Sequence, residues 1–130
     1  MRTLRVLLVE DNLADAELLS VWLEDLGAPL LIEHVERFTE ARERWPQEHY
    51  DALLLDLDIP DGFGLELLRK ALSLVGSRPV VVLTGNIDPL VKALALETGA
   101  AAYVLKGREH VPTLLAAVLG LQLGMGMEAD

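Results

Sequence analysis

Short apolar runs alternate along the chain with longer segments in which apolar residues recur every three or four positions. A short uninterrupted apolar run is typical of a strand buried on both faces of a sheet, and the longer period is that of an amphipathic helix. The runs predict strands at residues 4–9, 30–35, 52–56, 79–84 and 101–105. A helix is predicted after each strand, at residues 13–26, 40–45, 64–74, 89–99 and 109–121.

Several helix boundaries carry signals of their own. Asn12 and Asp88 precede predicted helices and have short polar side chains that can cap a helix N-terminus. Pro89 then occupies the first helical position, where proline is favoured. We expect Thr39 to cap the second helix and Gly99 to end the fourth.

The strict alternation of strands and helices predicts an α/β fold with a parallel sheet and helices on both of its faces. Neither a linker nor a low-complexity segment interrupts the pattern. We therefore expect one domain over residues 1–122 and a C-terminal tail over residues 123–130. In sheets of this kind ligands bind at the carboxyl ends of the strands.

The composition narrows the range of functions. The 130 residues include no cysteine, which excludes disulfides, a thiol nucleophile and a cysteine-ligated zinc. The net charge of −10 argues against direct binding to nucleic acid or to an anionic membrane, because both need basic surface. No secretory signal and no apolar run long enough to cross a bilayer is evident, so we expect a cytoplasmic protein.

Polar side chains stand where four of the predicted strands end. Glu10 and Asp11 follow the first strand, Asp56 ends the third, Thr84 ends the fourth and Lys106 follows the fifth. Because the carboxyl ends of parallel strands meet at one edge of a sheet, we expect these groups to face one crevice.

The chemistry of these groups is that of a phosphoryl site. Carboxylates placed close together raise one another's pKa unless a cation lies among them, and their oxygen atoms suit a hard ion such as Mg²⁺. Lys106 adds a positive charge and Thr84 a hydroxyl donor, which together can stabilise a phosphoryl group. Asp56 is then the natural nucleophile and would form an aspartyl phosphate.

In this order along the chain, these residues are similar to the pattern of a known family. The acidic pair, the Asp56 carboxylate, the turn after it, and a hydroxyl, an aromatic residue and a lysine in that order resemble the receiver domain of a bacterial two-component response regulator. The resemblance covers about residues 4–121 and implies a flavodoxin-like (βα)5 fold with strand order 2-1-3-4-5. The residues that carry it are Glu10, Asp11, Asp56, Pro60, Asp61, Gly62, Gly64, Thr84, Tyr103 and Lys106.

The resemblance implies a role for each matching residue around the metal. Asp11, Asp56 and the backbone carbonyl of Asp58 are expected to bind Mg²⁺ or Mn²⁺, and Glu10 to act mainly through water. Asp56 would accept a phosphoryl group from a sensor histidine kinase or a phosphotransfer protein. The domain would then be a signalling module and not an enzyme in its own right.

The resemblance also implies how the signal would leave the site. Thr84 and Lys106 are expected to contact the phosphoryl oxygens. Tyr103 would change rotamer when Thr84 moves inward, remodelling the face built from the fourth helix, the fifth strand and the fifth helix. A packing role in the core is the alternative for Tyr103, and we interpret Asp61 as a turn residue, not a ligand.

The sequence departs from the family pattern at two places. Gly107 follows Lys106, where the family usually has proline, and we predict a trans peptide there because a non-proline cis bond costs about 2.5–4 kcal/mol. Asp58 adds a carboxylate two residues after Asp56. Our hypothesis is that it orients the attacking water and shortens the lifetime of the phosphoryl group.

The fifth predicted helix has no charged residue over residues 111–121. A helix on the surface of a domain needs an apolar stripe on one side only, so a helix that is apolar all round predicts a covered surface. We expect a homodimer through the fourth and fifth helices, with Leu90, Leu94, Leu115 and Leu119 as candidate contacts.

Two other functions compete with the signalling module. Asp56 and Asp58 have the spacing of the two acids in haloacid-dehalogenase-like phosphatases, which would make the chain a phosphohydrolase. Those enzymes have a hydroxyl or β-branched residue where Pro60 stands, and they usually carry extra cap structure. The third function is a scaffold that is never phosphorylated.

Overall fold

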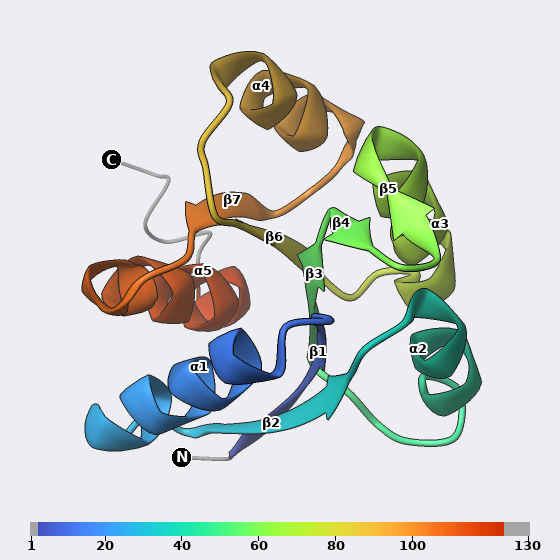
Figure 1. Cartoon of the computed structure of the whole chain (residues 1–130). Coiled ribbons are helices and arrows are strands. Elements are labelled where there is room, and N and C mark those ends of the chain that lie inside the picture. The colour runs from blue at the N-terminus through green and yellow to red at the C-terminus, as the bar shows by residue number, and fades with distance from the viewer. Residues whose placement is uncertain (1–2, 124–130) are drawn as a thin grey trace.

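A five-stranded parallel sheet forms the centre of the computed structural model, which describes residues 3–123. The order of the strands across the sheet is β2-β1-β3-β6-β7 (Figure 1), so the predicted order 2-1-3-4-5 is confirmed. The strands are β1 (Leu4–Val9), β2 (Leu30–Val35), β3 (Ala52–Asp56), β6 (Val80–Thr84) and β7 (Ala102–Leu105).

The two remaining strands form a small hairpin that the sequence pattern did not predict. Strands β4 (Asp58–Ile59) and β5 (Gly62–Phe63) pair antiparallel in a separate two-stranded sheet. Each is two residues long, which is too short to show an alternating pattern of apolar and polar residues. The hairpin connects the end of β3 to the next helix.

Helices cover both faces of the sheet, as predicted (Figure 1). Helices α1 and α5 lie on one face, and α2, α3 and α4 lie on the other. The helices are α1 (Leu13–Asp25), α2 (Phe38–Arg44), α3 (Gly64–Val75), α4 (Pro89–Thr98) and α5 (Val111–Leu123), with a short 3₁₀ helix, η1 (Arg108–His110), before α5. Most of the predicted tail, at residues 124–130, lies outside the described residues.

The core divides into two layers because side chains alternate between the faces of a strand. Leu53 and Leu55 of β3 point into the layer under α2, α3 and α4, whereas Leu54 points into the layer under α1 and α5. All three are fully buried. At about 1.5–3 kcal/mol for each buried leucine, strand β3 is a major source of stability.

The N-terminal helix caps follow the prediction at two of three places, and Gly99 ends α4 as predicted. The Asn12 side chain accepts a hydrogen bond from the Asp15 backbone N–H at 3.0 Å, and the Asp88 side chain accepts one from Leu90 at 3.0 Å. The prediction that Thr39 caps the second helix is wrong, because α2 already begins at Phe38.

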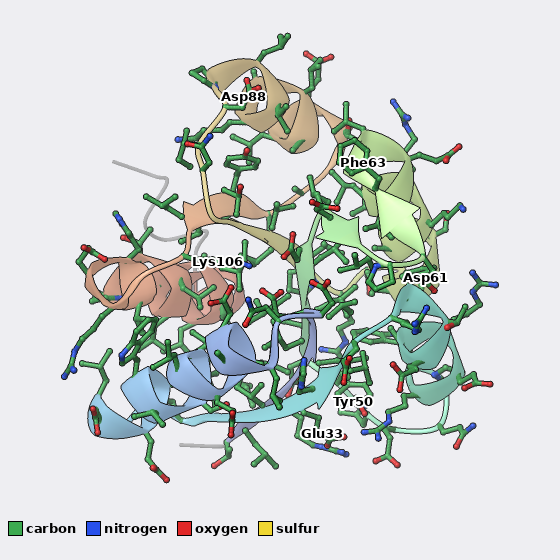
Figure 2. The ribbon with its side chains drawn as sticks, viewed as in Figure 1. Glu33, Tyr50, Asp61, Phe63, Asp88 and Lys106 are labelled. Carbon is green, nitrogen blue, oxygen red and sulfur yellow. The ribbon has the colours of Figure 1, made fainter. Side chains whose placement is uncertain are left out.

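Asp61 supplies the cap of α2 from the turn of the β4–β5 hairpin. Its carboxylate accepts hydrogen bonds from the backbone N–H groups of Phe38 at 2.8 Å and Thr39 at 3.0 Å, and Figure 2 shows it beside the first turn of that helix. A distant carboxylate thus replaces the local Thr39 hydroxyl.

In the residues that the structure describes, no helix is long and apolar enough to cross a membrane.

Candidate functional site

The predicted site residues lie at the carboxyl ends of neighbouring strands. Strand β3 lies between β1 and β6, and β6 pairs with β7, so the ends of these four strands are side by side. Asp56 and Thr84 are the last residues of β3 and β6, and Lys106 directly follows β7. Residues far apart in the sequence therefore meet at one edge of the sheet.

The Lys106 ammonium lies among the carboxylates. Its Nζ is 3.0 Å from Asp56 Oδ2 and 2.5 Å from Glu10 Oε1. Burial lowers the pKa of Lys106, but the hydrogen bonds and charges of Glu10 and Asp56 together outweigh it and hold the pKa well above its usual range. The lysine is therefore a permanent cation beside Asp56.

Both oxygen atoms of Asp56 are engaged. Oδ2 accepts from Lys106, and Oδ1 accepts a hydrogen bond from the Asp58 backbone N–H at 3.0 Å. The side chain is 15% exposed, so it is sheltered but still reachable from solvent. These contacts fix the direction in which the Asp56 carboxylate points.

Glu10 is the buried member of the acidic pair. Its Oε2 accepts a hydrogen bond from the Asn12 backbone N–H at 3.0 Å, and its side chain is only 3% exposed. Burial raises the pKa of Glu10, and the bonds from Lys106 and Asn12 oppose that rise. Asp11, by contrast, is exposed.

The arrangement of acids fits a hard divalent cation. Glu10, Asp11 and Asp56 each offer a carboxylate oxygen, and these atoms all lie within 4.8 Å of one another. Carboxylate oxygens are the donors that Mg²⁺ and Ca²⁺ prefer. The backbone carbonyl of Asp58 as a further ligand stays a prediction.

Thr84 and Tyr103 both form hydrogen bonds with the segment between β6 and α4. The Thr84 hydroxyl donates to the Asn86 carbonyl at 2.9 Å and accepts from the Asn86 N–H at 3.2 Å. Tyr103 is 8% exposed and packs in the core, and its hydroxyl accepts from the Asp88 N–H at 3.5 Å. This geometry suits either a packing role or a switch role for Tyr103.

The candidate interface residues differ in exposure. Leu90 and Leu94 on α4 are 67% and 37% exposed. Leu115 and Leu119 on α5 are only partly exposed, and Leu119 packs against the core under that helix. The apolar surface of this region is therefore concentrated on α4.

Sequence reasoning missed Asp15. Its Oδ2 lies 3.1 Å from Lys106 Nζ, so it is a third carboxylate around the lysine. The contact spans 91 residues of sequence, and nothing in the local pattern indicates it.

The Lys106–Gly107 peptide is trans, as predicted, and the described residues contain no cis peptide bond.

The sequence model of one protein family, the response regulator receiver domain, matches residues 6–118 of the chain. The virulence transcriptional regulatory protein PhoP of Salmonella typhimurium is 36% identical over 121 residues, which cover 91% of this chain and 51% of that protein. The chain spans 15% to 51% of the length of four related regulatory proteins, of which PhoP is one.

Solved structures of response regulators are similar to this chain. The RcsB response regulator of Salmonella typhimurium has a TM-score of 0.82 at 24% identity, covering 95% of this chain and 62% of that one, which supports the fold. A response regulator from Burkholderia pseudomallei, solved with a phosphorylated aspartic acid, a calcium ion and citrate, has a TM-score of 0.72 at 25% identity. The match covers 97% of this chain and 75% of that one. The chain therefore belongs to the response regulator receiver domain family.

Proposed function

We propose that Asp56 accepts a phosphoryl group from a histidine kinase or a phosphotransfer protein, in a reaction that depends on Mg²⁺ or Mn²⁺. The observation that carries the proposal is the convergence of Lys106, Glu10 and Asp11 on the Asp56 carboxylate. The phosphorylated aspartic acid and the calcium ion in the Burkholderia response regulator support the same chemistry.

In the proposed step an Asp56 oxygen attacks the phosphorus of the donor. The new bond joins Asp56 to phosphorus, and the bond between phosphorus and the leaving group breaks, with the electron pair going to the leaving group. Lys106 already contacts Asp56 and would contact the phosphoryl oxygens next. A divalent ion held by Asp11 and Asp56, with Glu10 acting through water and the Asp58 carbonyl as a further ligand, would supply neutralising charge.

The relay that we propose begins at Thr84. To contact the phosphoryl group, its hydroxyl must leave Asn86, which frees the segment before α4 to move. Tyr103 touches the backbone of Asp88, the cap residue of α4, and would transmit that movement. The affected surface is the face built from α4, β7 and α5.

We also propose that this face mediates homodimerisation. Exposed Leu90 and Leu94 place apolar surface on α4, at the end of the proposed relay. A self-association that responds to Asp56 would couple the chemistry of the site to an assembly state.

Phosphorylation by a small donor tests the central proposal. Acetyl phosphate and Mg²⁺ should add one phosphoryl group to the wild-type chain in an intact-mass measurement. The Asp56→Asn variant, or wild type with a chelator, should gain none. Continuous phosphate release with no accumulated phosphoprotein would instead indicate the phosphohydrolase, and no reaction at all would indicate the unphosphorylated scaffold.

A further inference from the structure

Within residues 3–123, three carboxylates from three different elements surround Lys106. Glu10 follows β1, Asp56 ends β3, and Asp15 lies in the first turn of α1. Figure 2 shows Lys106 at the edge of the sheet near α1 and α5. An ammonium group has three N–H donors, so these three acceptors use all of them.

A phosphoryl oxygen that binds Lys106 must therefore replace one of the three partners. Glu10 is 3% exposed and is also held by a backbone N–H, which makes it hard to displace. Asp56 would carry the phosphoryl group and therefore stays beside Lys106. Asp15 is 41% exposed, the most solvated of the three, and so loses least when it gives up the lysine.

The surroundings allow Asp15 to move without moving the helix. Asp15 and Lys106 both line a cavity of about 230 Å³, whose other walls include Trp22 and Leu19. The backbone of Asp15 is fixed, because its N–H donates to the Asn12 side chain at 3.0 Å. A change of rotamer is therefore enough to release Lys106.

We propose that Asp15 is a positioning residue that holds Lys106 beside Asp56 before phosphorylation and competes with the phosphoryl group for it afterwards. This inference rests on the proposed phosphorylation of Asp56. The negative charge of Asp15 also repels the dianionic phosphoryl group at short range. Asp15 thus makes the phosphorylated state less favourable than the other site residues alone would make it.

The test is the affinity for beryllofluoride, a phosphoryl mimic, measured by calorimetry at saturating Mg²⁺. Asp15→Asn keeps the shape and an oxygen acceptor but removes the charge, so it should bind about three- to tenfold more tightly, since partly exposed charges are screened by solvent. Added salt should shrink the difference. Asp15→Glu, which restores the charge, should bind less tightly than Asp15→Asn.

Glu17→Gln is the matched control, because Glu17 is an exposed acid on the same helix and the variant has the same change in net charge. It should bind like wild type. The inference is wrong if Asp15→Asn matches this control or binds more weakly than wild type. If wild type itself neither binds beryllofluoride nor becomes phosphorylated on Asp56, the proposed function fails instead, and the two failures are distinguishable.

Discussion

The acids of the candidate site differ in burial and in partners. Glu10 is buried and hydrogen-bonded, Asp56 is sheltered with both oxygens engaged, and Asp58 is exposed and donates its backbone N–H to Asp56. An exposed carboxylate two residues from the reacting group is free to contact solvent. The side chain of Asp58 is therefore available for the role that we propose for it.

Asp58→Asn should slow the loss of the phosphoryl group, because an amide is a poorer acceptor for the proton of an attacking water. We expect a rate about three- to tenfold lower, which corresponds to roughly 1 kcal/mol in the activation barrier. The measurement is the decay of phosphoprotein by intact mass after the donor is removed. Glu66→Gln, an exposed acid on α3, is the control and should decay like wild type. An unchanged rate in Asp58→Asn would end this hypothesis.

Individual site residues could be predicted where the topology alone determines their position. Asp56, Thr84 and Lys106 stand at strand ends, and parallel strands bring those ends together whatever the side chains do. Asp15 could not be predicted, because its contact with Lys106 depends on two side-chain conformations across 91 residues. The same holds for Asp61, whose turn position was recognisable but whose partners in α2 were not.

At the scale of elements, helix α2 depends on the hairpin that follows β3. Asp61 caps the first turn of α2 from the β4–β5 turn, so two segments separated by strand β3 are joined by one carboxylate. Burial raises the pKa of Asp61, but the bonds from Phe38 and Thr39 outweigh it and hold that pKa below its usual value.

Asp61→Ala should lower the free energy of unfolding by about 0.5–2 kcal/mol at neutral pH, since two N–H groups lose their partner. A carboxyl group with a lowered pKa in the folded state stabilises the fold above its unfolded pKa of 3.8. That contribution is lost as the pH falls through the folded value. The difference in the free energy of unfolding between wild type and variant, measured by urea unfolding, should therefore become smaller below about pH 4.

Asp61→Asn is the matched variant, because it keeps an acceptor for the N–H groups and cannot ionise. Its stability should lie between wild type and Asp61→Ala, with less dependence on pH than wild type. A gap between wild type and Asp61→Ala that stays constant from neutral to acidic pH would contradict the role of the charge.

At the scale of the whole molecule, the alternating pattern was enough to predict the sheet and its two helical layers. Buried parallel strands are continuous apolar runs, which are easy to recognise in a sequence. The β4–β5 hairpin was missed because strands of two residues carry no period. The surface was predicted less well than the core, since Leu119 belongs partly to the core under α5.

The exposed leucines of α4 predict self-association. Leu90→Asp should weaken the dimer at least tenfold in sedimentation, because burying one leucine contributes about 1.5–3 kcal/mol and a buried unpaired carboxylate costs more. Leu18→Asp on α1, at a leucine that is 45% exposed, is the control and should leave the dimer unchanged. A wild-type chain that stays monomeric at tens of micromolar, phosphorylated or not, would contradict the proposed interface.

In the proposed reaction the phosphoryl group is carried by Asp56. Borohydride reduces an aspartyl phosphate to homoserine, which peptide mass spectrometry locates by residue. After treatment with acetyl phosphate and Mg²⁺, homoserine should appear at position 56 and at no other aspartate. Homoserine at position 11 or 58, or an unmodified Asp56 in protein that has gained a phosphoryl group, would contradict phosphorylation at Asp56.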